Sequence, residues 1–211
     1  LCFGGIGAVL SATQAVGGGG GLVAIALGSG LALTVAVATF GGISGAHFNP
    51  AVSIGMAVVG RIGPAAAGVY IVMQVLGGLG ARLVCRALFP PDAIVQALMG
   101  LPLPAPWVTT GGLLLGESIG AFLLMLAIFG GVIDERGRAV KIGAFSIGLI
   151  IAANILAIGP VTGASFNPAR SFGPALVSGI WNFHLWYWIG PIAGATAGAW
   201  LYERILLDRK F

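Results

Sequence analysis

Two segments, with Arg170 as their one charged residue, contain the side chains best suited to chemistry, and their sequences are nearly the same. Asn49 and Asn167 lie 118 residues apart, and each is followed by Pro-Ala. Asparagine is favoured as the cap of a helix, and proline is favoured at the first helical position, so each tripeptide predicts the start of a short helix. The two segments read Ser44-Gly-Ala-His-Phe-Asn49-Pro-Ala-Val-Ser53 and Thr162-Gly-Ala-Ser-Phe-Asn167-Pro-Ala-Arg-Ser171.

Three ionisable side chains are further candidates for a functional or structural role. Arg170 has no acidic residue within 30 positions, so we expect it to face a pore rather than to pair with a carboxylate. Glu117 lies inside an apolar segment, where an unpaired carboxylate is costly. His47 has no second histidine or carboxylate nearby, and we expect it to hold its loop. We find no catalytic triad or carboxylate pair, and we expect no enzyme activity, no cofactor and no metal site.

The composition indicates that most of the surface of this chain faces lipid and not water. Only 8% of the 211 residues are charged, against 58% that are hydrophobic, and the mean hydropathy is +1.04. A soluble protein carries about 25% charged residues. No Asp, Glu, Lys or Arg occurs between Leu1 and Arg61. The chain is therefore predicted to be a membrane protein.

A helix needs about 20 apolar residues to span the hydrocarbon core, and the charged residues divide the sequence into windows of that size. Six spans result, of which the first is the remnant of a truncated helix. A Gly17–Gly21 run is a predicted flexible break after it. The spans are residues 1–15, 22–40, 62–81, 111–133, 142–158 and 184–201, before a charged tail at 203–210.

The distribution of basic residues predicts the orientation in the membrane. Alternating the loops across the bilayer places seven of them on one side, whereas Arg82 and Arg86 lie on the other. This bias assigns the seven, and with them the C-terminus, to the cytoplasm. It also explains the net charge of +4 without a nucleic-acid partner. The seven are Arg61, Arg136, Arg138, Lys141, Arg204, Arg209 and Lys210.

The repeated tripeptides are part of a longer internal repeat. We interpret the chain as one channel domain, residues 1–211, with an N-terminally truncated first copy at about 1–89 and a second copy at about 107–207. Each copy holds three spans, so the second is inverted relative to the first. The two Asn-Pro-Ala loops must then approach each other from opposite membrane faces. A helix from Asn49 to Val58 would rise about 15 Å, which is half of the core.

The doubled tripeptide, with Arg170-Ser-Phe-Gly-Pro after the second copy, resembles the aquaporin (major intrinsic protein) family over the whole chain. The resemblance implies an all-α membrane fold in which six transmembrane helices and two re-entrant half-helices form a pore, and an assembly of four identical subunits. It also implies that Glu117 accepts hydrogen bonds from a re-entrant loop. The equivalent glutamate of the first repeat is expected seven to ten residues before Leu1.

The same resemblance assigns roles to the loop residues. Asn49, Pro50, Ala51 and Asn167, Pro168, Ala169 form the two tips, whose Asn amides donate to a passing oxygen atom. Water is then held with its hydrogens pointing outward, which interrupts a proton wire. A ladder of carbonyl acceptors is expected from Gly45, Ala46, His47 and Phe48, and from Gly163, Ala164, Ser165 and Phe166.

The predicted selectivity filter is Ser29, Ile155, Ala164 and Arg170, a ring without an aromatic or a histidine side chain. Such a ring is wider and more apolar than a strict water filter, which favours passage of small uncharged solutes. Ser171, Ala175, Tyr187 and Trp188 instead resemble the water-selective subgroup, so the two signals conflict. Ile155 and Asp134-Glu-Arg are similar to archaeal aquaporins.

These observations predict a passive channel in the cell membrane for water and small neutral solutes such as glycerol, which excludes protons and ions. A secondary transporter is the alternative, because transporters also show inverted repeats and broken helices. The partners expected are the solutes, the lipid bilayer and further copies of the chain.

Overall fold

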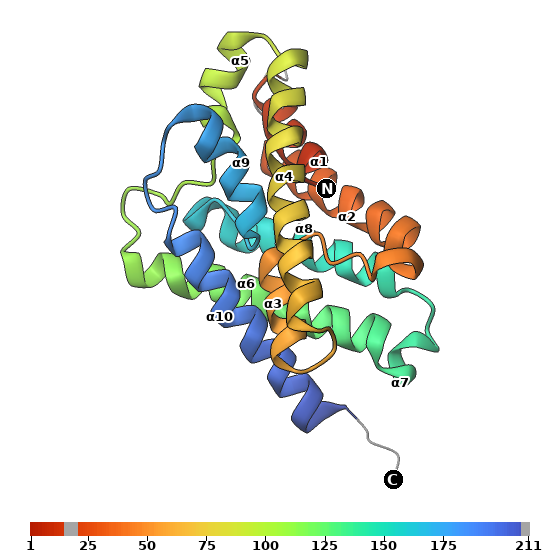
Figure 1. Ribbon diagram of the computed structural model, residues 1–211. Coiled ribbons are helices and arrows are strands. Elements are labelled where there is room, and N and C mark those ends of the chain that lie inside the picture. The colour runs from red at the N-terminus through yellow and green to blue at the C-terminus, as the bar shows by residue number, and fades with distance from the viewer. Residues whose placement is uncertain (15–20, 208–211) are drawn as a thin grey trace.

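The computed structural model describes residues 1–14 and 21–207, and every regular element within these ranges is helical (Figure 1). Residues 17–20 of the predicted glycine break at Gly17–Gly21, and the basic residues Arg209 and Lys210, lie outside the described residues, while Gly21 is the first residue of α2. The elements are α1 (Cys2–Gln14), α2 (Gly21–Ser44), α3 (Pro50–Val58), α4 (Pro64–Leu88), α5 (Pro91–Gln96), η1 (Leu98–Gly100), α6 (Thr110–Ile128), η2 (Phe129–Ile133), α7 (Glu135–Arg138), α8 (Gly143–Thr162), α9 (Pro168–Ser178), α10 (Trp186–Leu201) and η3 (Tyr202–Leu206).

Each of the six predicted spans corresponds to a helix, and the predicted all-α class is confirmed. Four helices are long and apolar enough to cross a membrane: α2, α4, α6 together with η2, and α8. The other two are shorter, with 13 residues in α1 and 16 in α10, which the π-helical turn η3 extends. Figure 1 shows α5 at one end of the bundle and the last turns of α10 at the other; we call the latter the C-terminal end.

Three predicted span ends were wrong. The second span was expected to stop at Phe40, but α2 continues to Ser44. The third span was expected to stop before Arg82, but α4 continues to Leu88 because the side chain of Arg82 is buried, with 2% of its surface exposed. A charged residue therefore does not mark a helix end here. The fifth span was expected to stop at Ile158, but α8 continues through Pro160 to Thr162. Proline removes one backbone hydrogen bond there without ending the helix.

The two Asn-Pro-Ala tripeptides begin the short helices α3 and α9. Pro50 and Pro168 occupy the first helical position, and Asn49 and Asn167 precede them with extended backbones, at φ −154° and −152°. The side-chain oxygen of each Asn accepts a hydrogen bond from the first turn of its own helix. Both short helices lie within the bundle, as Figure 1 shows.

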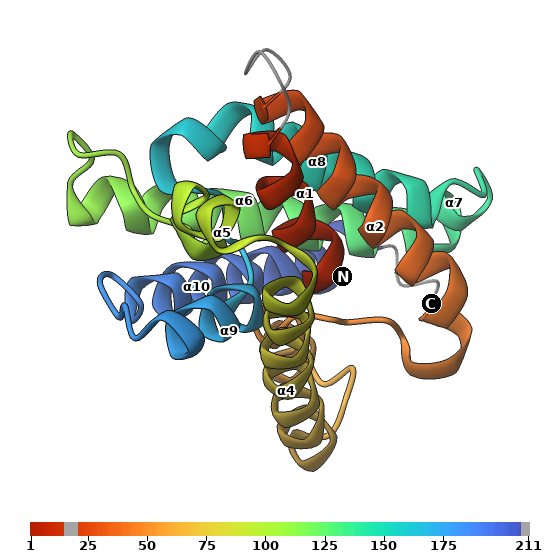
Figure 2. The same ribbon diagram turned by 90° about the horizontal axis from the view of Figure 1, so that it is seen from above.

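The helices pack in a pattern that the two halves of the chain share. In the first half α1 packs on α4, and in the second α6 packs on α10. Each half-helix packs on a long helix of the other half, α9 on α4 and α3 on α10, while α2 packs on α8. In Figure 2, a view from above, α6, α8 and α10 are seen side-on and α5 lies over them. The exchange of half-helices ties the two halves into one bundle.

The close approach of α4 to α9 depends on a glycine. A Cβ atom at Gly78 would collide with the backbone oxygen of Ala169, and one at Gly173 would collide with the backbone oxygen of Gly78. The neighbouring Gly77 is different, because a Cβ atom there would meet nothing within 4 Å. Of the adjacent pair Gly77 and Gly78, only Gly78 is therefore required by packing.

We expect Gly78→Ala to lower the melting temperature of the detergent-solubilised protein, because the added methyl group pushes α4 away from the start of α9. Overpacking of this kind costs about 1–3 kcal/mol, and each kcal/mol shifts the melting temperature of a chain of this length by roughly 2–4 °C. Gly77→Ala is the matched control, since the same change in open space is neutral or stabilising. Equal melting temperatures for the two variants would contradict this account of the α4–α9 contact.

Candidate functional site

The tips of the two half-helices meet through reciprocal hydrogen bonds. Nδ2 of Asn49 donates to the backbone oxygen of Phe166 at 2.8 Å, and Nδ2 of Asn167 donates to the backbone oxygen of Phe48 at 2.9 Å. The two loops are more than 100 residues apart in sequence, with separations of 117 and 119 residues for these bonds. Each amide has a second N–H, which is left for a molecule that passes between the tips.

The same two Asn side chains also cap their helices. Oδ1 of Asn49 accepts from the backbone N–H of Ala51 at 2.9 Å, and Oδ1 of Asn167 accepts from Ala169 at 3.0 Å and Arg170 at 3.3 Å. Both ends of each amide are thus fixed, the oxygen by its own helix and one N–H by the opposite loop. The direction of the remaining N–H is therefore set by the fold.

The backbone before each tip has an unusual conformation that occurs twice. A left-handed φ is rare for residues other than glycine and persists where the surrounding structure enforces it. Here it recurs at the same positions in both repeats, which turns alternate peptide groups in opposite directions. The residues with positive φ are Gly45 (72°), Ala46 (49°) and Phe48 (49°), and Gly163 (81°), Ala164 (47°) and Phe166 (51°).

These loops line a cavity of about 480 Å³. Its wall includes Leu101 and Leu103 from the segment after η1, and Val132 and Ile133 from the turn at the C-terminal end of α6. The cavity therefore extends from one end of the bundle past the two tips toward the other. Of the residues predicted to contribute carbonyls and tip amides, those on the wall are Gly45, Ala46, His47, Asn49, Gly163, Ala164, Ser165, Phe166 and Asn167.

Phe48 is not on that wall, although it was predicted with the other carbonyl residues. Its backbone oxygen is the acceptor for Asn167. Phe166 has the equivalent bond from Asn49 and does contact the cavity. Pro50, Ala51, Pro168 and Ala169 are buried behind the tips and form the first turns of the half-helices.

Glu117 supports the second loop from behind. Its Oε1 accepts from the backbone N–H of Ser165 at 3.0 Å and from the hydroxyl of Thr162 at 2.7 Å, while its Oε2 accepts from the N–H of Phe166 at 2.6 Å. The side chain is fully buried. The carboxylate accepts hydrogen bonds from loop N–H groups that have no helical partner. The backbone carbonyls of the loop are therefore free to face away from Glu117.

His47 is held by its surroundings in the first loop. Its Nδ1 lies 3.0 Å from the hydroxyl of Ser53, which also accepts a hydrogen bond from Nε2 of Gln74 at 2.9 Å. The ring contacts Tyr70 edge to face, with centroids 5.1 Å apart. Tyr70 in turn donates to the backbone oxygen of Ser44. These contacts fit a residue that fixes the loop.

The four residues predicted as a filter all line the same cavity. Ser29, Ile155 and Ala164 are each about 7% exposed or less, and Ile155 and Ala164 belong to one packed cluster. Arg170 follows the second tip, and its Nη1 is buried without a hydrogen-bond partner among the described residues. Nor does Arg170 form an ion pair within the described part of the chain. A buried, unpartnered donor on the cavity wall is suited to bind a polar group in transit.

Several supporting residues were not predicted from the sequence. Nδ2 of Asn154 donates to the backbone oxygen of Gly120 at 3.0 Å, next to the ring of Phe166. The hydroxyl of Tyr187 donates to the backbone oxygen of Thr162 at the start of the second loop. Asn154 could have been found, because an amide in the middle of an apolar span needs a partner.

Comparison with known proteins identifies the family of the chain. The sequence model of the major intrinsic protein family matches residues 1–202. The chain belongs to the major intrinsic protein family. Among its relatives, aquaporin TIP4-4 of Zea mays is 38% identical over 211 residues, covering 97% of this chain and 81% of the relative. Probable aquaporin AqpM of Archaeoglobus fulgidus is 42% identical over 194 residues, covering 90% and 78%.

The fold of this major intrinsic protein is also found in a solved structure. The X-ray structure of the aquaglyceroporin from Plasmodium falciparum superposes with a TM-score of 0.85 and 24% identity, covering 97% of this chain and 90% of that one. The predicted resemblance, including the likeness to archaeal aquaporins, is thereby confirmed. The chain is a passive membrane channel for water and small solutes and is not an enzyme.

We expect Glu117→Gln to destabilise the channel and to lower water permeation. The amide has one acceptor oxygen in place of two and directs an N–H at a loop N–H, and an unsatisfied buried donor costs about 1–3 kcal/mol. Melting temperature and water permeability of proteoliposomes at equal protein content measure the effect. Ser118→Ala on the same helix removes one hydrogen bond, to Gly190, and should change both quantities less. A wild-type melting temperature for Glu117→Gln would refute the supporting role.

Proposed function

We propose that this channel conducts water and small neutral solutes such as glycerol through the cavity between the two tips, and that it excludes protons and ions. The observation that carries the proposal is the pair of reciprocal hydrogen bonds that brings Asn49 and Asn167 together on the wall of one cavity. Amide donors, loop carbonyls and apolar walls then alternate along a single path. Such a path replaces the hydration of a neutral molecule but not that of an ion.

Exclusion of charge follows from the orientation of the half-helices. The N-terminal ends of α3 and α9 face each other, and each carries roughly half a positive charge. For a cation about 5 Å from both ends at an effective dielectric of about 20, the repulsion is about 3 kcal/mol. A water molecule whose oxygen accepts from the Asn amides points its hydrogens outward in both directions. The chain of hydrogen bonds needed for proton transfer is then reversed at the tips.

The filter residues support a permeability wider than water alone. Ser29, Ile155 and Ala164 are small or aliphatic, and Arg170 supplies an unpartnered donor opposite them. A polyol has hydroxyl groups along one side and C–H groups along the other, so it can face the guanidinium and the aliphatic side chains at once. This match favours glycerol and molecules of similar size and polarity.

The setting of the channel is proposed on the same basis. We place it as a multi-pass protein of the cell membrane, with Arg61, Arg136, Arg138, Lys141 and Arg204 on the cytoplasmic side, because basic loops stay in the cytoplasm. The C-terminal end is then the cytoplasmic mouth.

The two inverted repeats are proposed at about 1–89 and 107–207. Large apolar side chains remain exposed on the helices, which fits contact with lipid and with three further copies in a homotetramer.

Stopped-flow light scattering of proteoliposomes tests the function. We expect faster water and glycerol equilibration than in empty liposomes, and no dissipation of a proton gradient above the background. Flux should follow the solute gradient and stop at equal concentrations. Accumulation of glycerol above equilibrium would favour the secondary transporter instead, and proton leakage that depends on the protein would contradict the role of the tips.

A double substitution tests the filter. Ser29→Phe with Ile155→His introduces an aromatic ring and an imidazole where the wall is now small and aliphatic. We expect glycerol permeation to fall by roughly ten-fold or more while water permeation stays within about two-fold, because filter size limits the larger solute first. Leu149→Phe, on an exposed position of α8, is a control for added bulk outside the cavity. Equal loss of both permeabilities would show that these residues do not form the constriction.

A further inference from the structure

The C-terminal end of α6 carries a buried carboxylate that the conduction path does not use. Asp134 follows the π-helical turn η2, and only 4% of its surface is exposed. Its backbone N–H donates to the oxygen of Phe129 at 2.8 Å, which closes the turn with one residue more than an α-helical turn has. Its Oδ1 accepts from the backbone N–H of Arg136 at 2.9 Å and so caps α7.

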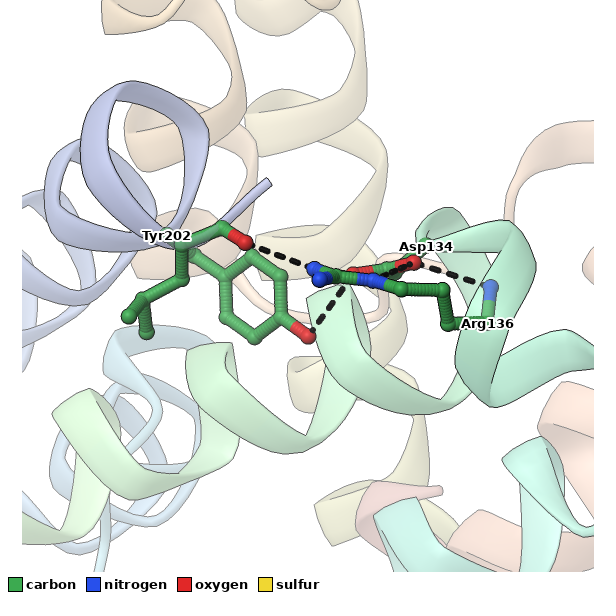
Figure 3. Close-up of polar contacts among 4 residues, drawn as sticks. Asp134, Arg136 and Tyr202 are labelled. Carbon is green, nitrogen blue, oxygen red and sulfur yellow. Dashed lines mark hydrogen bonds and ion pairs between the residues drawn. The ribbon is translucent and has the colours of Figure 1, made fainter. Parts of the chain in front are cut away.

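Asp134 joins three segments of the chain, as Figure 3 shows. The guanidinium of Arg136 donates to both carboxylate oxygens through Nε, at 3.0 Å each. The hydroxyl of Tyr202 lies 3.2 Å from Oδ2, and Nη2 of Arg136 donates onward to the backbone oxygen of Leu206 at 2.6 Å. Hydrogen bonds thus connect the end of α6, the helix α7 and the turn η3. We call Asp134, Arg136 and Tyr202 the mouth clamp.

Neighbouring contacts extend the mouth clamp to the first half-helix. The rings of Phe129 and Tyr202 are 5.4 Å apart, at an interplanar angle of 30°. Arg61, which follows α3, lies over the ring of Phe129 at 6.0 Å and forms an ion pair with Glu203 at 2.8 Å. The ends of α3, α6 and α10 therefore meet beside the clamp.

The turn that the mouth clamp holds is also part of the cavity wall. Val132 and Ile133 belong to η2, immediately before Asp134, and both line the cavity. A π-helical turn displaces the residues that follow it relative to an α-helix, and such turns are frequent at functional sites. Gly130 and Gly131 precede these two side chains, and their lack of a side chain lets the turn pack closely: a Cβ atom at Gly131 would collide with Oγ of Ser146, and one at Gly130 would lie 3.2 Å from the hydroxyl of Tyr202.

We propose that Asp134 is a positioning residue for the C-terminal mouth of the channel, which acts with Arg136 and Tyr202 to hold η2 so that Val132 and Ile133 stand along the passage and not across it. This inference rests on the proposed function, because it assumes that solutes leave or enter the cavity beside these two side chains. Without the mouth clamp the turn η2 can shift, so that Val132 and Ile133 enter the mouth. The two side chains then form a narrow apolar constriction, and such a constriction loses its water.

The clamp is persistent at ordinary pH. The hydrogen bonds from Arg136, above all, lower the pKa of Asp134 to about 2. A lowered pKa means that the contacts are complete above the ordinary value for a free carboxyl group and are lost as the pH falls through about 2. Its carboxylate contacts the guanidinium of Arg136 and the hydroxyl of Tyr202, while Arg61 and Glu203 pair with each other beside the rings of Phe129 and Tyr202. The clamp is thus a fixed support and not a proton-operated gate.

The test compares variants of the clamp in proteoliposomes with equal amounts of folded channel. Asp134→Asn keeps the helix-capping oxygen but removes the charge, Tyr202→Phe keeps the ring contact but removes the hydroxyl, and Arg136→Gln removes the guanidinium. Arg138→Gln is the matched control, because it makes the same change at an exposed arginine two residues further on. Water permeability, its temperature dependence and the glycerol-to-water ratio are measured for each.

We expect Asp134→Asn and Arg136→Gln to lower water permeability per channel by roughly three-fold or more and to steepen its temperature dependence, because the mouth becomes a dewetting constriction. Tyr202→Phe should have a smaller effect, and Arg138→Gln none. A merely structural role would reduce the number of active channels without changing the temperature dependence. If the wild type conducts and all three clamp variants share its temperature dependence, the inference is overturned while the proposed function stands. A wild type that does not conduct would overturn the proposed function itself.

Discussion

The structure depends on one constraint: backbone that leaves the helical conformation at membrane depth must find partners for its N–H and C=O groups within the protein. Glu117 takes the N–H groups of Ser165 and Phe166, and the Asn side chains take one carbonyl from each opposite loop. Loop residues of both repeats line the cavity, and we propose that a solute is the partner of their remaining carbonyls. The passage is therefore a consequence of how the loops satisfy their own polar groups.

Selectivity follows from the same arrangement with few further residues. Two helix ends supply positive potential at the tips, and Arg170 adds a full charge on one side of them. The rest of the wall is largely aliphatic, so it offers no polar groups to replace the hydration shell of an ion. A neutral molecule needs only a few hydrogen bonds, which the tips and carbonyls supply. The protein thus selects against charge without a titratable group at the centre.

The sequence predicted the parts that depend on local residue preferences and on the repeat. Asn49-Pro50 and Asn167-Pro168 specify a cap and a first turn by themselves, and an odd number of spans per copy inverts the second. The continuation of α8 to Thr162 was missed because Pro160 does not end that helix. The continuation of α4 past Arg82 was missed because burial inside the bundle, which no local pattern encodes, removes this charged side chain from solvent. The reciprocal bonds to Phe48 and Phe166 and the contacts of Asp134 with Tyr202 were missed for a similar reason. They join residues 68 to 119 positions apart, and only tertiary packing sets such distances.

The internal repeat also explains why the two halves of the cavity differ. The offset of 118 residues relates the filter positions Ser29, Ala164 and Arg170 to Ile147, Ala46 and Val52, and Ile155 to Val37; all eight line the cavity. The second ring has no polar side chain, so on that side the loop carbonyls and the neighbouring side chain of His47 supply the hydrogen-bond partners. A fold that is symmetric in its backbone thus becomes asymmetric through side chains. We propose that discrimination by charge and size is concentrated at Arg170. On the other side of the tips, the same proposal makes the positions of the aliphatic side chains, Ile133 included, decide whether water is retained.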